Sequence, residues 1–190
     1  MPLFIISLPA LMEKIKINDK TFAPYLRNNR IQAEIQRLAS EINERHRGKK
    51  IAFLPVLSGS FLFFADLVKH IELDFEVHFV KYKSYIGTDT TGKVQKLLSP
   101  PANLNNRVAV IVEDIVDTGN TLKSIIPDVE NAQPDELNIC TLLLKPEKYD
   151  AFYPVNFIGF EIENDFVVGY GLDYDEAGRG LQHIYKLSNN

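Results

Sequence analysis

The stretch that most limits the fold of this chain is V-A-V-I-V-E-D-I-V-D-T-G-N-T-L, from Val108 to Leu122. It begins with apolar, mostly β-branched residues, continues through three acidic residues and ends in a T-G-N-T turn. Beyond the turn, apolar residues recur at the spacing of one helix face, at Leu122, Ile125, Ile126 and Val129. The stretch therefore predicts a buried strand over Arg107–Val112, a turn and a helix. Carboxylates at the end of a buried strand need an explanation, because ionised groups are costly to bury.

Similar strand and helix patterns alternate through the first two-thirds of the chain. Helices are predicted over Asn29–Lys50, closed by Gly48, and over residues 61–71 with Phe61, Phe64, Leu67, Val68 and Ile71 facing inward. The other predicted strands are Ile51–Leu57, Phe75–Tyr82, Leu137–Leu144, Phe157–Ile162 and Phe166–Leu172. Such alternation predicts an α/β fold with a mostly parallel central sheet covered on both faces. Ligands of these sheets bind beyond the carboxyl ends of the strands, where the acidic residues lie.

Length and charge narrow the class of protein. We expect a single domain over residues 1–190, because 190 residues suit one core and no repeat or linker divides the chain. A net charge of -4 without long like-charge runs argues against a protein that binds nucleic acid or a membrane surface. The apolar start of the chain lacks the basic region of a signal sequence and is too short to span a membrane. Residues 1–11 are either an extra N-terminal arm or precede a true start at Met12.

Cysteine and histidine give little sign of a metal or disulfide site. The single cysteine, Cys140, lies in an apolar run and is expected to be a buried core residue. The chain therefore has no internal disulfide, which predicts a reducing, cytoplasmic setting. None of the four histidines has metal-ligand spacing, at positions His46, His70, His78 and His183.

The T-G-N-T turn and the acidic pair Glu113 and Asp114 together predict a ribose-phosphate pocket. A helix that begins at this turn offers free amides and the positive end of its dipole, and Gly119 lets a phosphate approach closely. The carboxylates would repel that phosphate unless they face sugar hydroxyls or a divalent ion. The alternative is that the acidic pair is a solvated loop and Thr118 an ordinary N-cap.

These residues resemble a known family. V-I-V-E-D-I-V-D-T-G-N-T is similar to the phosphoribosyl pyrophosphate motif of type I phosphoribosyltransferases, and its E-D-I-V-D-T-G form resembles the hypoxanthine-guanine branch. Further blocks of that branch follow in the same order from Met12 to the C-terminus. They are V-L-S-G-S-F-L-F-F-A-D-L, K-Y-K-S-Y, L-L-L-K and F-I-G-F-E-I-E-N-D-F-V-V-G-Y-G-L-D-Y-D-E-A-G-R-G-L.

The resemblance implies the type I phosphoribosyltransferase fold, with a small hood formed by residues 12–27 and 150–190. It implies transfer of ribose 5-phosphate from phosphoribosyl pyrophosphate to hypoxanthine and guanine, giving IMP, GMP and pyrophosphate in purine salvage. It also implies Mg²⁺ as cofactor and a homodimer or homotetramer. The alternatives are a xanthine-preferring enzyme and a non-catalytic nucleotide-sensing regulator of the same fold. Low basic content and an intact set of base-pocket residues argue against the regulator.

The resemblance also assigns a role to each site residue. For the sugar and phosphates, Glu113 and Asp114 hold the ribose hydroxyls and Mg²⁺, and Asp173 holds a second Mg²⁺. The 5-phosphate is bound by the turn residues Thr118, Gly119, Asn120 and Thr121. The pyrophosphate is bound by Arg179 and by the first-loop residues Ser58 and Gly59. The purine meets Asp117 at N7, Lys145 at O6, the Phe166 ring and the Val167 backbone. Ser84 and Tyr85 lie on a flap that closes over the site.

Most of these residues also have a simpler interpretation. Asp117 could cap the helix, Lys145 could be a lysine that reaches from a strand end into solvent, and Phe166 could be a core residue. Asp173 and Arg179 could be solvated loop charges. The polar stretch that begins at Ser84 is either a functional flap or a mobile surface loop.

Ser58 departs from the family pattern. The first loop commonly reads Leu-Lys-Gly, whereas this chain has Leu57, Ser58 and Gly59. Because Gly59 is retained, we expect the loop to keep its pyrophosphate-binding backbone, which in the family often holds a non-proline cis peptide bond. The charge of the usual lysine is absent, so any pyrophosphate affinity or subunit pairing that depends on it is in doubt.

Overall fold

The apolar runs form a five-stranded parallel sheet in the computed structural model, which describes residues 13–84 and 94–188. The strand order is β4-β3-β7-β8-β9, and every neighbouring pair is parallel. The strands are β3 Ile51–Pro55, β4 Phe75–Val77, β7 Val108–Val116, β8 Glu136–Leu144 and β9 Phe157–Glu161. The predicted fold class is thereby confirmed.

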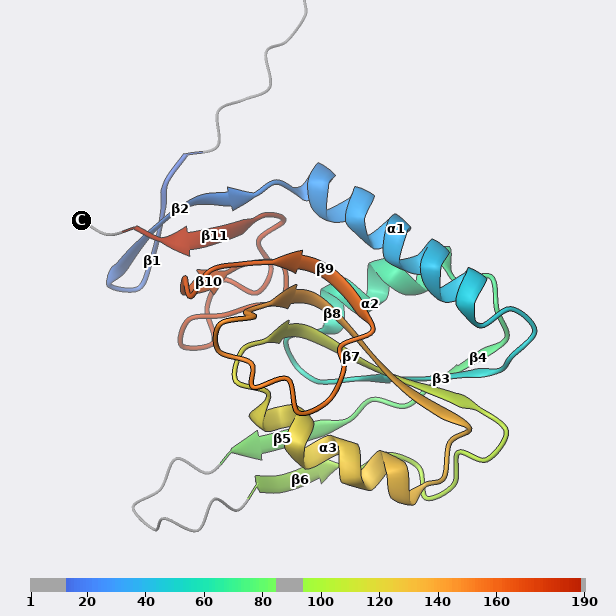
Figure 1. Ribbon diagram of the computed structural model, residues 1–190. Coiled ribbons are helices and arrows are strands. Elements are labelled where there is room, and N and C mark those ends of the chain that lie inside the picture. The colour runs from blue at the N-terminus through green and yellow to red at the C-terminus, as the bar shows by residue number, and fades with distance from the viewer. Residues whose placement is uncertain (1–12, 85–93, 189–190) are drawn as a thin grey trace, which may run out of the picture.

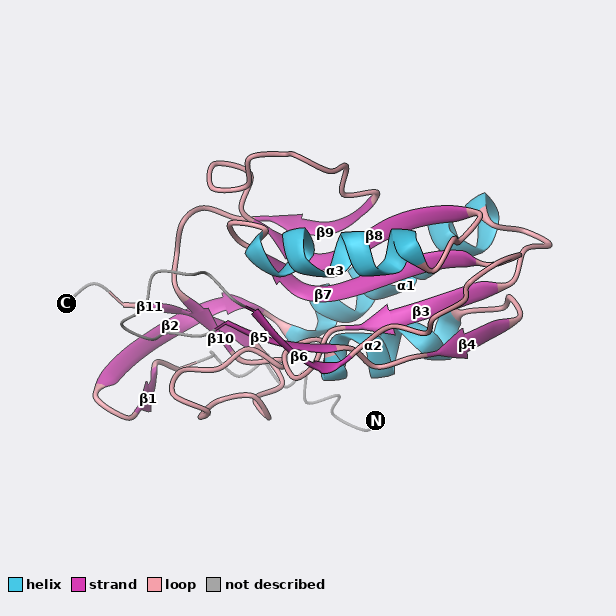
Figure 2. Cartoon of the chain, turned by 90° about the horizontal axis from the view of Figure 1, so that it is seen from below, coloured by secondary structure: helices cyan, strands magenta, loops and turns pink. Residues whose placement is uncertain are grey.

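Helices cover both faces of this sheet, with α1 and α2 on one face and α3 on the other (Figure 1). In β7, Val108, Val110 and Val112 pack in the core that includes α1 and α2, whereas Ala109 and Ile111 pack with α3. Successive side chains of a strand point to opposite faces, so an unbroken apolar run is what a sheet covered on both sides requires. The helices are α1 Asn28–Arg45, α2 Phe61–Leu67 with the 3₁₀ helix η1 Val68–His70, and α3 Asn120–Asn131. In Figure 2, α3 lies over β7 and β8 and runs along them.

A second, antiparallel sheet forms the hood. It joins two segments that are far apart in the sequence, and its strand order is β1-β2-β11-β10. The hood lies beyond the carboxyl ends of the parallel strands (Figure 1). The strands are β1 Ile15–Ile17, β2 Lys20–Leu26, β10 Val167–Val168 and β11 Ile184–Leu187. Ile17, Phe22, Val168 and Tyr185 form its own small core. The boundaries of the single domain stay a prediction, and the arm 1–11 lies outside the described residues.

The helix predictions need two corrections. Helix α1 ends at Arg45 rather than near Lys50, and Gly48 has a left-handed φ of +78° in the turn that follows. Phe61 was expected to face inward, but its side chain is 38% exposed. It lies in the first turn of α2, where Phe63 and Phe64 take the buried side.

The strand predictions also need corrections. The predicted strand Phe75–Tyr82 is two strands. After β4 the chain still follows β3, because His78 N and Val80 N donate to Phe53 O and Pro55 O. Strand β5 then pairs with β6 in a separate antiparallel ribbon. The ribbon strands are β5 Lys81–Ser84 and β6 Val94–Leu98. The predicted strand Phe166–Leu172 shrinks to Val167–Val168, because left-handed residues follow at Gly169, Tyr170 and Gly171. Finally, β7 continues to Val116, four residues beyond its predicted end.

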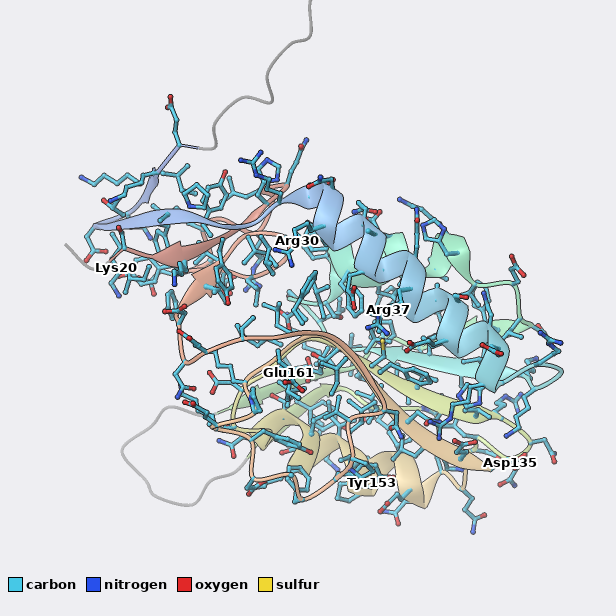
Figure 3. The ribbon with its side chains drawn as sticks, turned by 45° about the horizontal axis from the view of Figure 1, so that its top comes forward. Lys20, Arg30, Arg37, Asp135, Tyr153 and Glu161 are labelled. Atoms are coloured by element: carbon cyan, nitrogen blue, oxygen red, sulfur yellow. The ribbon has the colours of Figure 1, made fainter. Side chains whose placement is uncertain are left out.

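The side chain of Arg37 connects α1 to the edge of the sheet. Arg37 projects from α1 toward β9 (Figure 3), and its Nη2 donates to the carbonyl oxygen of Ile158 at 2.6 Å. Cys140 is fully buried in β8, as predicted. Within residues 13–84 and 94–188, no helix has the length and hydropathy needed to cross a membrane.

Candidate active site

A cavity of about 250 Å³ lies at the junction of β7 and α3. Ten consecutive residues line it, numbers 113–122. Helix α3 begins at Asn120, and Gly119 before it has a φ of +78°. Its first helical hydrogen bond runs from Lys123 N to Gly119 O at 2.9 Å, so the amides of residues 120–122 precede it. The predicted phosphate-binding turn is therefore a helix N-terminus that opens on a cavity.

The close packing of Gly119 explains why a glycine is needed there. A Cβ atom at this position would lie 2.6 Å from Cε2 of Tyr149 and 2.9 Å from Cε1 of Phe152. The left-handed backbone also disfavours other residues. The N-cap position is thus Gly119 without a side-chain hydrogen bond, so Thr118 is not the ordinary N-cap that the alternative interpretation required.

Glu113 and Asp114 belong to β7 rather than to a loop after it. Glu113 is opposite Thr141 of β8 and is only 5% exposed, so the solvated-loop interpretation is wrong for it. Burial, and secondarily the charge of Asp114, raises the pKa of Glu113 well above its usual range. Burial also raises the pKa of Asp114 to about 6, although bonds from backbone amides and the charge of Arg179 oppose the rise. The ionised forms of two buried carboxylates at a cavity can be stabilised by a bound cation or by hydroxyl donors.

The first loop packs directly on Asp114. This loop joins β3 to α2 and holds a cis peptide bond between Leu57 and Ser58, as the resemblance implied. A Cβ atom on Gly59 would overlap the carboxylate of Asp114. On its other side, a Cβ atom on Gly171 would overlap the carbonyl oxygen of Gly59. Glycine at both positions allows the strand end, the first loop and the hood to meet.

Asp173 and Arg179 pair with each other at the edge of this junction. Arg179 Nη2 lies 2.9 Å from Asp173 Oδ1 and 3.0 Å from Glu176 Oε2, and its Nη1 donates to Gly171 O at 3.0 Å. The side chains of Asp173 and Arg179 are 29% and 24% exposed. Neither is the solvated loop charge of the simpler interpretation, since both are partly buried and hold the loop that touches Gly59.

Asp117 and Lys145 form a second charged group at the same edge. Lys145 Nζ donates to Asp117 Oδ2 at 2.9 Å, and Lys145 N donates to Val116 O at 2.9 Å. The Lys145 side chain is only 5% exposed, so it does not reach into solvent as the simpler interpretation assumed. Asp117 faces this lysine and makes no capping bond to α3.

Phe166 directly precedes β10 and is 42% exposed, so it is not a core residue. Its ring centroid lies 6.2 Å from that of Phe22 and 5.8 Å from that of Tyr174. Lys20, which Figure 3 labels on the hood, places its ammonium 4.3 Å from the Tyr174 ring. Val167 pairs with Lys186 in the hood and is buried. The structure thus presents an open aromatic face beside the hood strands.

Comparison with known proteins places the chain in a family. Residues 23–175 match the family described as the phosphoribosyl transferase domain. Over 160 residues the chain is 40% identical to the hypoxanthine phosphoribosyltransferase of Escherichia coli K12, covering 83% of this chain and 90% of that protein. The chain belongs to the hypoxanthine phosphoribosyltransferase family.

Other members of this family support the assignment. The hypoxanthine-guanine phosphoribosyltransferase of Mycobacterium avium is 38% identical over 164 residues, which is 83% of this chain and 81% of that protein. A crystal structure of a hypoxanthine-guanine phosphoribosyltransferase from Bacillus anthracis matches with a TM-score of 0.79 and 35% identity, and covers 91% of this chain and all of that chain.

The carboxylates of this phosphoribosyltransferase fit a magnesium ion only together with a substrate. Within residues 13–84 and 94–188, no group of three or more histidine, cysteine or acidic residues could hold a metal ion on its own. Mg²⁺ usually takes one or two protein carboxylates and completes its octahedral shell with water and substrate phosphates. Glu113, Asp114 and Asp173 supply carboxylates of that kind.

The structure describes only part of the predicted flap. Ser84 is the last residue of β5, and Tyr85 lies outside the described residues. The ribbon that leads to them is fastened to α3, because Asp128 accepts from Tyr82 Oη and Lys96 Nζ, both at 2.6 Å. Sequence reasoning missed this ribbon, since its strands are short and polar.

Sequence reasoning also missed two groups of side-chain contacts in this phosphoribosyltransferase. Tyr170 Oη donates to Asp66 Oδ2 at 2.5 Å, and Gln32 Nε2 donates to the same oxygen at 2.8 Å, which joins the hood to α1 and α2. Lys148 Nζ lies 3.3 Å from Asp117 Oδ1. The Pro146 turn after Lys145 was a usable signal for Lys148, because it folds the chain back toward the strand end. The hydrogen bond between Tyr170 and Asp66 joins residues that are 104 positions apart, so no local sequence pattern predicts it.

The raised pKa of Asp114 predicts a pH-dependent gain in stability on replacing it. Its ordinary value is 3.8 and its folded value is about 6, so the ionised form destabilises the fold above pH 6. We expect Asp114→Asn to raise the free energy of unfolding at neutral pH by up to about 3 kcal/mol. The gain should fade as the pH falls from 6 toward 4, because the wild-type carboxyl becomes protonated. Urea unfolding at a series of pH values, without Mg²⁺ or substrate, measures it.

Asp128→Asn serves as the control of opposite sign. Burial would raise the pKa of Asp128, but bonds from Lys96 and Tyr82 hold it below its ordinary value. This variant should lose stability at neutral pH, because the ionised form of Asp128 is the one that the fold favours. A loss of stability at neutral pH in Asp114→Asn as well would contradict the interpretation of Asp114.

Proposed function

We propose that this protein is a purine salvage enzyme that transfers ribose 5-phosphate from phosphoribosyl pyrophosphate to hypoxanthine and guanine. The products are IMP or GMP and pyrophosphate. The observation that carries the proposal is one edge of the sheet where a helix N-terminus, two buried carboxylates and the Asp117–Lys145 pair meet. Members of the family named for these reactions match most of the chain.

The cavity at the α3 N-terminus is the proposed site of the 5-phosphate. Backbone amides of the turn and the hydroxyls of Thr118 and Thr121 donate to the phosphate oxygens, and the helix dipole favours their negative charge. Glu113 and Asp114 accept hydrogen bonds from the ribose hydroxyls. Bonds of this kind compensate the burial of the two carboxylates, which raises their pKa values.

Lys145 and Asp117 are proposed to recognise the purine. An ammonium group has only donors, so Lys145 favours the O6 acceptor of hypoxanthine and guanine over the amino group of adenine. Asp117 accepts the proton from N7 as N9 bonds to C1′ of the ribose, and the C1′–O bond breaks with its electron pair leaving on pyrophosphate. The exposed ring of Phe166 stacks on the base, and the Val167 backbone meets the base edge.

Arg179, Asp173 and the first loop are proposed to bind the pyrophosphate. Arg179 donates to its oxygens, and backbone groups at Ser58 and Gly59 line its path. Mg²⁺ held by Glu113, Asp114 and Asp173 with the substrate would neutralise the charge that builds on the leaving group. Ser84 and Tyr85 remain the proposed flap residues, whose closure would exclude water from the activated sugar.

A direct assay tests the function. Purified protein with Mg²⁺ and phosphoribosyl pyrophosphate is given hypoxanthine, guanine, xanthine or adenine in turn, and the ultraviolet absorbance of the base is followed. We expect turnover with hypoxanthine and guanine and none with adenine, because Lys145 cannot accept from an amino group. Absence of turnover with every base would refute the enzyme, and turnover confined to xanthine would refute the substrates. Reaction without Mg²⁺ serves as the control for the metal.

Assembly and location stay predictions. A homodimer or homotetramer fits the two phenylalanines that remain exposed around α2, because Phe61 is 38% exposed and Phe79 is 46% exposed. The Phe79 ring lies 6.1 Å from that of Phe64, one helical turn after Phe61. A cytoplasmic location fits the single buried thiol of Cys140.

A further inference from the structure

Lys148 reaches Asp117 because of the turn that follows β8. Lys148 N donates to Lys145 O at 3.1 Å, and Tyr149 N donates to the same oxygen at 3.1 Å. Pro146 occupies the second position of this turn, which its fixed φ favours. The turn therefore holds two lysines on one carboxylate, with Lys145 on Oδ2 at 2.9 Å and Lys148 on Oδ1 at 3.3 Å.

The two lysines differ in their surroundings. The Lys145 side chain is 5% exposed and that of Lys148 is 40% exposed. Asp117 Oδ1, the oxygen that faces Lys148, is buried and makes no hydrogen bond to any described residue. Its charge is therefore balanced on that side by the nearby ammonium alone.

No other described cation pairs with Asp117. On the same turn, Glu147 accepts from Asn164 Nδ2 at 3.0 Å, toward the hood. On α3, Lys123 is held by Asp150 at 2.7 Å. On β7, the charges nearest in sequence are the carboxylates of Glu113 and Asp114, which would add negative charge rather than balance it.

We propose that Lys148 is a positioning residue that holds Asp117 in its orientation while a 6-oxopurine occupies Lys145. The inference rests on the proposed function. When Lys145 directs donors to the purine O6, it neutralises Asp117 less, and Oδ2 becomes free to accept from N7. Lys148 then supplies the remaining positive charge from the side of Oδ1, so that Oδ2 points to the base.

Removing this cation frees the Asp117 carboxylate to turn, because no other described residue pairs with Oδ1. A carboxylate that has turned is misplaced for the N7 proton, and misplacement at a reacting centre slows the chemical step. Lys148→Met should therefore lower kcat for hypoxanthine, by about tenfold, with little change in KM.

The experiment compares kcat and KM for hypoxanthine in the wild type, Lys148→Met, Lys148→Arg and Lys123→Met. Arginine keeps the charge and should restore the wild-type kcat. Lys123→Met removes a similarly exposed lysine that is paired with Asp150 rather than with Asp117, and it should leave kcat and KM unchanged. Lys148 is half-exposed, so its replacement by methionine removes no core packing; circular dichroism checks the fold.

Several outcomes would overturn the inference. They are a kcat of Lys148→Met equal to that of the wild type, an equal loss of kcat in Lys123→Met, and a higher KM for hypoxanthine without any loss of kcat. The last would make Lys148 a substrate contact. If the wild type turns over no base, the proposed function itself fails; if it turns over hypoxanthine and Lys148→Met has the same kcat, only the role of Lys148 fails.

Discussion

Asp117→Asn is expected to lower kcat for hypoxanthine about 10²-fold to 10⁴-fold, the usual contribution of a general base. Asparagine keeps the size and one oxygen of the side chain but cannot take up the N7 proton. The affinity for phosphoribosyl pyrophosphate should change little, because the proposed contacts of the 5-phosphate are at the α3 N-terminus and those of the ribose are at Glu113 and Asp114. Steady-state kinetics give kcat, and calorimetric titration with phosphoribosyl pyrophosphate and Mg²⁺ gives the affinity.

Asp150→Asn is a matched control for this loss. Asp150 also pairs with a lysine, Lys123 at 2.7 Å, but lies outside the group around Lys145. It should keep near-wild-type turnover. If Asp117→Asn weakened sugar-phosphate binding as much as turnover, Asp117 would be a structural residue of the turn rather than the base.

Gly59→Ala is expected to lower kcat/KM for phosphoribosyl pyrophosphate about 10²-fold, the loss that a displacement of about 1 Å can cause at a reacting centre. A methyl group on Gly59 would overlap the carboxylate of Asp114, which is packed at the end of β7. Gly171 closes the other side of the loop, so the loop cannot retreat without moving the hood. Either Asp114 or the pyrophosphate loop must shift.

Gly180→Ala provides the comparison, because a Cβ atom there meets nothing within 4 Å. Its kcat/KM and melting temperature should match those of the wild type. A Gly59→Ala enzyme with unchanged kcat/KM would show that Asp114 can move without losing its place at the ribose. A thermal melt of Gly59→Ala separates lost folding from a displaced site.

The signals that the sequence carries for the candidate site are local. The T-G-N-T turn and the strand before it lie within Val108–Leu122, and the apolar face of α3 continues to Val129. In the structure, residues 113–122 line one cavity. The resemblance added Lys145, which the structure brings to Asp117 from the neighbouring strand. Both strands end at the same edge of a parallel sheet, and strand-end residues of such a sheet meet there.

Local patterns failed where the answer depended on distant partners. Sequence alone ended β7 at Val112, because charged residues are poor candidates for a buried strand, yet pairing with β8 carries it to Val116. Phe61 was placed inward by its apolar character, but Phe63 and Phe64 occupy the buried side of a helix of seven residues. Short polar strands such as β5 and β6 became visible only through their pairing.

The sequence by itself determined the α/β class, the turn before α3 and the carboxylates at the end of the preceding strand, because strand, turn and helix follow one another along the chain. Only the tertiary structure decided the electrostatic state of those groups. Burial sets the raised pKa values of Glu113 and Asp114, and chain reversal brings Lys148 to Asp117. Both depend on neighbours from other elements, whose distances no linear pattern encodes.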